Sequence, residues 1–213
     1  MSRIRAIVSD FGGVLTTPLT HAFAGVQEDH GIPLESLGKA MWRATQERGE
    51  NPLFPLERGE MSEADFLSVL ADALEAELGR RVELRDFTER YFAQLSPNDE
   101  MLDYLRRVRA EHGLKLGMLT NNVREWEARW RSMIPDIDAL FDVVVDSAFV
   151  GMRKPEPGIY ALTLERLGVP GGECAFVDDL DVNCVAARDA GMIAVHFVDT
   201  ASTIAELDAL LTS

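Results

Sequence analysis

Four short polar motifs in the sequence contain the residue types that phosphoryl transfer requires. They are Asp10, Thr120-Asn121-Asn122, Lys154 and Asp178-Asp179. A carboxylate can act as the nucleophile, a hydroxyl and an amide can hold phosphate oxygens, and a lysine can offset their charge. Each motif alone is common as a helix cap, a turn or a solvated residue. Their joint occurrence indicates an enzyme site.

The acidic pair Asp178-Asp179 predicts a bound cation. If the pair faces Asp10 across one site, the carboxylates repel one another unless a cation neutralises them. Hard carboxylate oxygens, completed by water, are ligands that suit Mg2+. We therefore expect Mg2+ as the cofactor.

The elements that must position these motifs are the strands of a parallel sheet. Residues 4–9 are largely apolar and β-branched, and Gly12-Gly13 follows, so we expect Asp10 at the end of a buried strand. After Pro97, helical patterns alternate with further strands over 115–120, 141–145, 174–177 and 192–198. This alternation predicts an α/β fold, in which ligands bind beyond the carboxyl ends of the strands.

The stretch from about residue 19 to residue 95 has a different character. It contains three or four amphipathic helical patterns and no convincing strand. Its clearest helix begins after Ser62, which can cap it together with Asp65, and ends at Gly79. We expect a helical insertion into the α/β domain.

Composition limits the classes of function. The 213 residues are 46% hydrophobic, enough for one large domain or for a core with a smaller inserted domain. The net charge of -15 repels the phosphate backbone of nucleic acids. The apolar runs are far shorter than the roughly 20 residues of a membrane helix. We expect a cytoplasmic protein that binds a small anion, and neither nucleic acid nor membrane.

The motifs together resemble those of the haloacid dehalogenase-like hydrolases, and the resemblance spans the whole chain. It implies an α/β fold with a Rossmann-like three-layer parallel-sheet core, residues 1–16 plus 97–213, and an inserted α-helical cap, residues 17–96. It is closest to the phosphatase-like branch of the superfamily. The segments that carry the resemblance are Ser9-Asp10-Phe11-Gly12-Gly13-Val14-Leu15, Leu119-Thr120-Asn121-Asn122, Lys154-Pro155-Glu156-Pro157, and Phe176-Val177-Asp178-Asp179 with Asn183.

The resemblance implies catalytic roles for three residues and a phosphate-binding role for a fourth. Asp10 would attack phosphorus and form an aspartyl-phosphate. Thr120 and the neighbouring backbone amide of Asn121 would hold the transferring group, while Lys154 would neutralise its charge. The substrate would be a small phosphorylated metabolite.

The resemblance also implies a ligand set for the metal. Asp10, Asp179 and the main-chain carbonyl of Gly12 would bind Mg2+, with Asp178 either a further ligand or a supporting partner. Asn183 would brace the loop that carries the acidic pair.

Gly12 departs from the pattern of these phosphatases. They usually carry a second Asp at this position, which protonates the leaving oxygen and then activates water. Glycine keeps the carbonyl for the metal but removes the proton shuttle, whose help is worth roughly 10² to 10⁴ in rate. Turnover would be slow except on good leaving groups, unless a cap or substrate group supplies the proton.

Two other functions stay open. The dehalogenases of the superfamily also lack an acid at the position of Gly12, so the chain could be a 2-haloacid dehalogenase-type hydrolase that needs no metal. The Asp178-Asp179 pair argues against this, because its carboxylates repel one another without a cation. The third alternative is a catalytically weak protein of this fold that binds or regulates. The sequence does not identify the substrate.

Several other residues are expected to be structural. Trp42 is expected in the interior of the cap, and Glu57 is expected to pair with a nearby solvated arginine. Trp126 and Trp130 lie one helical turn apart, a spacing typical of packing or an oligomer contact, and either a monomer or a homodimer is compatible with it. His21 could supply the missing base but is expected to be exposed. The only cysteines, Cys174 and Cys184, are expected to be reduced thiols in the core.

Overall fold

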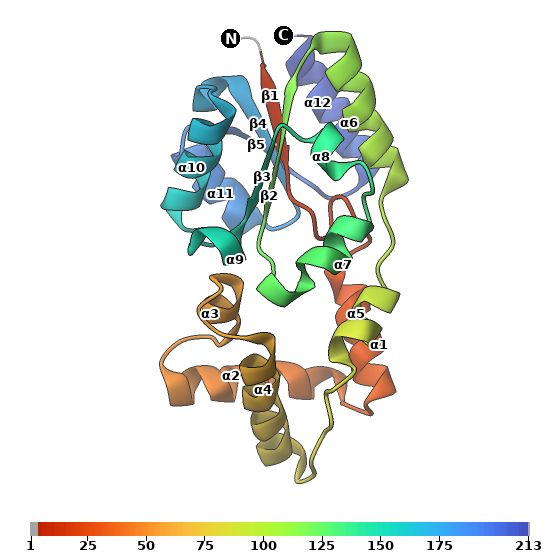
Figure 1. Ribbon diagram of the computed structural model, residues 1–213, viewed down its shortest axis with the longest axis vertical. Coiled ribbons are helices and arrows are strands. Elements are labelled where there is room, and N and C mark those ends of the chain that lie inside the picture. Colours follow the sequence, from red (N-terminus) through yellow and green to blue (C-terminus); the bar gives the residue numbers. More distant parts are fainter. Residues whose placement is uncertain (1–3, 213) are drawn as a thin grey trace.

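The computed structural model describes residues 4–212, and its central element is a five-stranded parallel sheet (Figure 1). The strand order is β3-β2-β1-β4-β5, and every neighbouring pair is parallel. All the strands expected from the sequence are present, although several of their ends differ from the expected ones by one or two residues, and the first begins at Ala6 rather than Ile4. The α/β prediction is confirmed. The strands are β1 Ala6–Ser9, β2 Lys115–Thr120, β3 Val143–Asp146, β4 Cys174–Asp178 and β5 Ile193–His196.

Helices cover both faces of the sheet, because the side chains of the buried strands alternate between two apolar clusters. In β1, Ile7 packs in one cluster, and Ala6 and Val8 pack in the other. The first cluster lies under α6 Asp99–His112, α7 Glu127–Ser132, α8 Ile137–Leu140 and α12 Thr200–Leu211. The second lies under α10 Pro157–Leu167 and α11 Asp181–Asp189. Short helical turns fill the connections, namely η1 Arg124–Trp126, α9 Ser147–Val150 and η2 Gly171–Glu173.

A separate group of helices follows β1 and lies beyond one end of the sheet (Figure 1). It has five members where the sequence patterns predicted three or four, because α3 and α5 are short. Among the described residues this segment contains no strand. The helices are α1 Leu19–Asp29, α2 Leu34–Arg48, α3 Leu53–Glu57, α4 Glu63–Leu78 and α5 Phe87–Ala93. They share an apolar cluster of their own, built mainly from α1, α2, α4 and α5.

The ends of α4 are those the sequence predicted. The Ser62 hydroxyl accepts a hydrogen bond from the backbone N–H of Asp65 at 3.1 Å. Gly79 ends the helix with φ of 67°, a left-handed conformation that glycine adopts without strain. Both termini of this helix are therefore set locally.

The chain leaves the sheet region and returns to it side by side. Thr16 and Pro97 form an antiparallel bridge, and the backbone N–H of Thr17 donates to the carbonyl of Ser96 at 2.9 Å. The helical group is thus joined to the sheet through two paired segments. Between residues 4 and 212, no helix is both long and apolar enough to cross a membrane.

Candidate active site

Three of the four polar motifs meet at the carboxyl end of the sheet. Strand β1 lies between β2 and β4, so the residues that end these strands become neighbours. Asp10 follows β1, and its backbone N–H donates to the carbonyl of Val177 at 2.8 Å. Thr120 ends β2 and Asp178 ends β4, and both are buried. In sheets of this type the point between such strands is where ligands bind.

The fourth motif reaches the same place through Lys154. Its ammonium lies 2.8 Å from Asp10 Oδ1 and 2.6 Å from Asp178 Oδ2, and only 1% of the residue is exposed. Burial acts to lower the pKa of Lys154, but the two carboxylates outweigh it and raise the pKa above its ordinary value. The lysine is therefore a fixed positive charge shared by two carboxylates.

Asp178 is fully enclosed and its carboxylate is satisfied on both oxygens. While Oδ2 accepts from Lys154, Oδ1 accepts from the backbone N–H of Leu180 and from Asn183 Nδ2, each at 2.9 Å. Asn183 is held in turn by the Tyr160 hydroxyl, which donates to its carbonyl at 3.1 Å. These hydrogen bonds fix the loop after β4, which is the loop that Asn183 was predicted to hold.

Only one carboxylate oxygen of Asp10 contacts the neighbouring groups in the part of the chain that the structure describes. Oδ1 accepts from the backbone N–H of Phe11 at 2.7 Å and contacts Lys154, which leaves Oδ2 as the oxygen for other partners. Burial raises the pKa of Asp10 to about 8; Lys154 opposes this increase, and the Asp178 and Asp179 carboxylates add to it. Without a further positive charge the ionised form of Asp10 is therefore disfavoured.

The acidic cluster fits a divalent cation. Asp10, Asp178 and Asp179 each offer an oxygen, and these atoms all lie within 4.8 Å of one another. Burial, followed by the nearby Asp178 charge, raises the pKa of Asp179. Lys154 pairs with two of these three carboxyl groups, so the third has no cationic partner in the cluster. Oxygen donors in this number and charge are those that Mg2+ accepts.

The two glycines after Phe11 are needed for different reasons. Gly13 has φ of 81°, and a Cβ on it would lie 2.5 Å from Asp179 Oδ2. Glycine therefore lets Asp179 approach the loop. A Cβ on Gly12 would instead lie 2.8 Å from Leu19 Cδ1, at the start of α1. A side chain at Gly12 would therefore require the end of the Leu19 side chain, an apolar residue of the helical group, to move aside.

Asn121 holds the segment that carries Lys154. The backbone N–H of Lys154 donates to Asn121 Oδ1 at 2.8 Å, and Asn121 Nδ2 donates to the Lys154 carbonyl at 3.0 Å. This leaves the main-chain amide as the part of Asn121 suited to a phosphate oxygen. Thr120 lies beside it, with its hydroxyl 3.4 Å from the Asn121 carbonyl.

These side chains line one end of a cavity of about 400 Å³ between the sheet and the helical group. All the site residues expected from the sequence line it except Asp178, which is buried beneath. The rest of the wall is mainly aromatic and aliphatic and comes largely from the helical group.

Glu57 of α3 also lines the cavity, where the sequence predicted only a partner for a nearby surface arginine. It pairs with Arg153 at 2.5 Å, and each side chain is 14% exposed. Its carboxylate also lies 3.4 Å from Asn121 Nδ2. Burial raises the pKa of Glu57 although Arg153 opposes the shift. The contact joins residues almost a hundred positions apart, so no local pattern could indicate it.

Comparison with known proteins supports the assignment that the motifs suggest. The family described as haloacid dehalogenase-like hydrolase matches residues 4–191. The chain belongs to this family. It is therefore a hydrolase by family membership, and the resemblance of its motifs and fold is confirmed.

Relatives of this haloacid dehalogenase-like hydrolase carry different activities in their names. A phosphatase from Mycobacterium tuberculosis is 36% identical over 198 residues, covering 92% of this chain and 88% of its own. An L-2-haloacid dehalogenase of known structure is 25% identical, covers 100% of both chains and has a TM-score of 0.68. A family enzyme from Bacteroides thetaiotaomicron, solved with magnesium and inorganic phosphate, is 20% identical, covers 91% of this chain and 93% of its own, and has a TM-score of 0.68.

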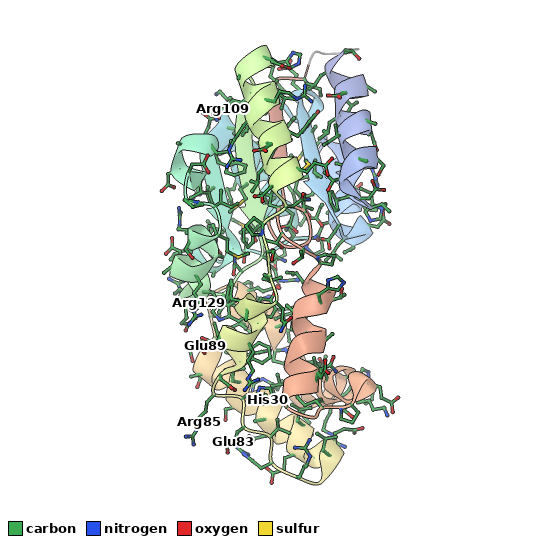
Figure 2. The ribbon with its side chains drawn as sticks, turned by 90° about the vertical axis from the view of Figure 1, so that its right-hand side faces the viewer. His30, Glu83, Arg85, Glu89, Arg109 and Arg129 are labelled. Atoms are coloured by element: carbon green, nitrogen blue, oxygen red, sulfur yellow. The ribbon has the colours of Figure 1, made fainter. Side chains whose placement is uncertain are left out.

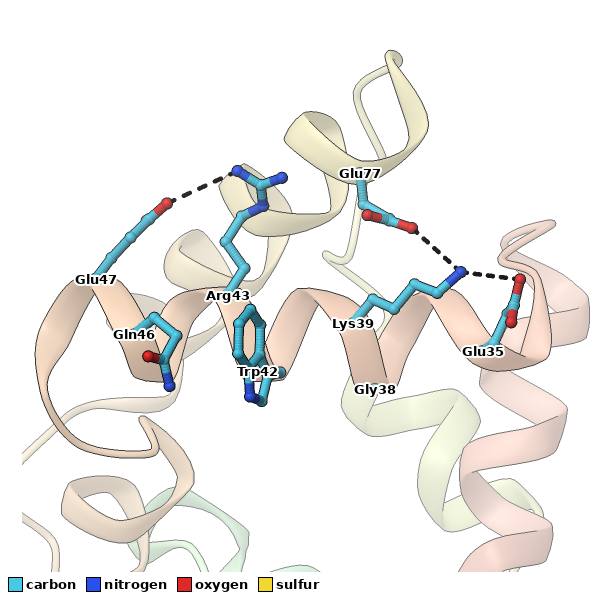
Figure 3. Close-up of a pocket in the computed structure, with 8 residues that line it drawn as sticks. All are labelled: Glu35, Gly38, Lys39, Trp42, Arg43, Gln46, Glu47 and Glu77. Carbon is cyan, nitrogen blue, oxygen red and sulfur yellow. Dashed lines mark ion pairs between the residues drawn. The ribbon is translucent and has the colours of Figure 1, made fainter.

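Two of the three tryptophans of this hydrolase lie in the environment that the sequence predicted. Trp130 is fully buried against Phe11, and Trp126 packs on Tyr91 and Phe92, so both take part in packing. The expectation for Trp42 is wrong. It is 67% exposed on the outer face of α2 (Figure 3), because the helix buries its alanines Ala40 and Ala44 instead.

The histidine and the cysteines considered from the sequence do not line the cavity of the hydrolase. His21 is exposed and does not line the cavity, and Cys174 and Cys184 are free and buried, all as expected. The helical group is also tied to the core at its surface, where Arg129 of α7 pairs with Glu89 of α5 at 2.6 Å (Figure 2).

Proposed function

We propose that the chain is a Mg2+-dependent phosphatase that hydrolyses a small phosphorylated metabolite through an aspartyl-phosphate on Asp10. One observation carries the proposal: Lys154 joins Asp10 to Asp178 while Asp179 brings a third carboxylate within 4.8 Å. A buried acidic cluster of this kind serves a reaction with a cation and an anionic group. The phosphatase name of the mycobacterial relative supports the same activity.

Each site residue has its own role in the proposed reaction. Asp10 Oδ2 attacks phosphorus as the bond to the leaving oxygen breaks, and Oδ1 stays held by Phe11 and Lys154. Lys154 offsets the charge on the phosphoryl group. The Thr120 hydroxyl and the main-chain amide of Asn121 hold its oxygens. Water then attacks the aspartyl-phosphate, which releases inorganic phosphate and restores Asp10.

The metal ligands in this proposal are Asp10, Asp179 and the carbonyl of Gly12, with Asp178 supporting from below and Asn183 holding its loop. When bound, Mg2+ neutralises phosphoryl oxygens and makes phosphorus easier to attack. The Bacteroides neighbour, which shares the fold, was solved with magnesium and inorganic phosphate.

The proton shuttle is the part that the chain lacks. A Cβ at position 12 would lie 2.8 Å from Leu19 Cδ1, so in this proposal the leaving oxygen departs beside an apolar side chain. We therefore propose that the enzyme works best on leaving groups that need no proton from the protein.

The remaining organisation is proposed on the same basis. Residues 1–16 plus 97–213 form the hydrolase core and residues 17–96 the cap, because the chain crosses between them at the paired segments near Thr16 and Pro97. The acidic chain acts in the cytoplasm, as a monomer or a homodimer.

The test is release of inorganic phosphate from acetyl phosphate and from p-nitrophenyl phosphate, with Mg2+ and with a chelator, by the natural chain and by Asp10→Asn. We expect turnover that requires both Mg2+ and Asp10. Activity that survives Asp10→Asn would overturn the mechanism.

The same proteins would then be tested on a 2-haloacid without metal. Gly12, which carries no acid, is the observation that favours dehalogenation, as is the dehalogenase of similar structure. Chloride release without phosphate release would establish that alternative. Absence of both reactions, with Mg2+ still bound, would indicate a binding or regulatory protein.

A further inference from the structure

We propose that the substrate is an organic phosphate whose released group is apolar and compact, an inference that rests on the proposed phosphatase function. The cavity above Asp10 has two chemically different ends. Its lower end carries the nucleophile, Thr120, Lys154 and Asp179, where the phosphoryl group would lie. Its upper end, on the cap side, is where the leaving group must extend.

The upper end is walled by rings. Its aromatic side chains come from the cap and from the segment after β2, and they pack on one another. Phe23 meets Tyr91 edge to face with ring centroids 5.3 Å apart, and Tyr91 lies 4.9 Å from Trp126. Phe66, Phe87 and Phe92 complete this wall. Burial of an apolar group against such a surface lowers the free energy of binding, whereas a hydroxyl group finds few hydrogen-bond partners there.

Two of the polar groups near this wall are already engaged. The Trp126 indole N–H donates to the Thr88 hydroxyl at 3.1 Å, and Glu57 is paired with Arg153. A leaving group rich in hydroxyls, such as a sugar, would bury them without these partners, and each unpaired hydroxyl would weaken binding. The wall therefore discriminates against polar leaving groups.

Leu19 extends the apolar surface down to the reacting atoms. Its Cδ1 would lie 2.8 Å from a Cβ at Gly12, the position from which this family usually protonates the leaving oxygen. The first atoms of the leaving group beyond its oxygen thus contact an aliphatic side chain. The position without an acid and the apolar wall are therefore continuous with each other.

The size of the cavity limits the released group. About 400 Å³ is near the lower end of the range of roughly 300 to 1,000 Å³ for small-molecule sites, and the phosphoryl group takes part of it. Hydrolysis forms the bond from Asp10 Oδ2 to phosphorus as the phosphorus–oxygen bond breaks. The apolar group leaves in this step, as a carboxylate or as an alkoxide that takes a proton from solvent. Water then attacks the aspartyl-phosphate and gives inorganic phosphate and free Asp10.

A series of acyl phosphates from acetyl to octanoyl separates apolar contact from leaving-group chemistry. The carboxylate leaving group has nearly the same basicity throughout, so the missing acid affects every member alike. Burial of one methylene lowers the free energy by about 0.8 kcal/mol, which corresponds to a rise in kcat/KM of about threefold to fourfold per methylene. We expect this rise until the cavity is full, followed by a plateau.

Alkylphosphonates, which are not hydrolysed, provide a readout that does not need turnover. Their Kd, measured by calorimetry with Mg2+ from ethyl to octyl, should fall by a similar factor per methylene. Glucose 6-phosphate should compete weakly against the longer members. A Kd series without slope would overturn the inference whether or not the chain is catalytic.

Two cap leucines give a matched pair of variants. Leu53 and Leu78 are both partly buried and both pack on the apolar cluster of the cap, but only Leu53 lines the cavity. We expect Leu53→Gln to flatten both series and Leu78→Gln to leave their slopes unchanged. Equal slopes in the two variants would contradict the assignment of the wall.

The outcomes separate this inference from the function on which it rests. Release of phosphate from acetyl phosphate, with no gain along the acyl series, would leave the phosphatase standing and refute the apolar leaving group. No release from any acyl phosphate would refute the phosphatase. The Kd series would then show whether the wall still selects apolar phosphonates.

Discussion

The two ends of the cavity differ in how their residues are held. At the core end, Lys154 and Asp178 are buried and each makes defined polar contacts with neighbours. At the cap end, Phe23 and Tyr91 are held by packing on other rings. Polar contacts fix positions closely, whereas packed apolar surfaces tolerate changes of similar volume. The difference suggests that the core determines the reaction and the cap determines the molecule on which it acts.

The two regions meet at Leu19 and Gly12. A cap residue there fills the space beside the nucleophile, so the apolar character of the cap reaches into the chemistry. Changes in the core, at this junction and in the cap should therefore have effects of different size.

The largest effect is expected from Lys154→Met at the core end. The substitution leaves Asp10 and Asp178 buried without the ammonium they share. We expect kcat/KM to fall by about 10³-fold, as for loss of a group that stabilises a transition-state charge. The free energy of unfolding should fall by about 3 to 5 kcal/mol.

The control for this prediction is Lys39→Met, which removes an exposed ammonium on α2. It should leave both quantities nearly unchanged. Phosphate-release kinetics and denaturant unfolding measure the two effects. Retained activity in Lys154→Met would show that the charged end of the cavity is not the reacting end.

The junction gives the next largest effect. Gly12→Asp alone should gain less than the double variant, because its Cβ must displace the end of the Leu19 side chain, whereas Gly12→Asp with Leu19→Ala leaves room for the carboxylate. On alkyl phosphates, which are poor leaving groups, the double variant should raise kcat/KM by up to about 10² over the natural chain.

Acetyl phosphate is the matched substrate, since its leaving group needs no proton. Its kcat/KM, which reports formation of the aspartyl-phosphate, should not increase in the double variant, whereas its kcat, limited by hydrolysis of that intermediate, should rise. Leu19→Ala alone should raise neither constant. If Gly12→Asp alone raises kcat/KM on alkyl phosphates as much as the double variant does, Leu19 does not hinder a carboxylate at position 12.

The smallest effect is expected where the cap attaches to the core. A double-mutant cycle of Glu57→Gln and Arg153→Met should give a coupling of about 1 to 3 kcal/mol in the free energy of unfolding, because this pair is mostly buried. The pair of Arg81 and Glu75 is exposed on the cap, so its coupling should stay below about 1 kcal/mol. Equal couplings would indicate that the cap is not held at this contact.

The core could be predicted well from the sequence because its signals are local. An apolar run that ends in a polar residue indicates both a buried strand and the point where the strand ends, as at Asp10 and Asp178. Parallel pairing then brings such residues together. The fold prediction is confirmed, while the roles of the individual site residues stay predictions.

The cap could be predicted only as a set of helices. The spacing of apolar residues indicates that a helix has a buried side but does not identify its partner, so Trp42 was expected inside and lies outside. Leu19 and Glu57 contribute to the site through contacts with residues distant in sequence. Such contacts depend on how the helices pack, which periodicity does not encode.

The central claim is that Asp10 carries the phosphoryl group. Because the chain lacks the usual base at position 12, hydrolysis of the aspartyl-phosphate should be slow, and the intermediate should accumulate during turnover of acetyl phosphate with Mg2+. Borohydride reduction after an acid quench, followed by peptide mass spectrometry, should find homoserine in place of Asp10. Steady phosphate release with Asp10 unmodified throughout would contradict the account.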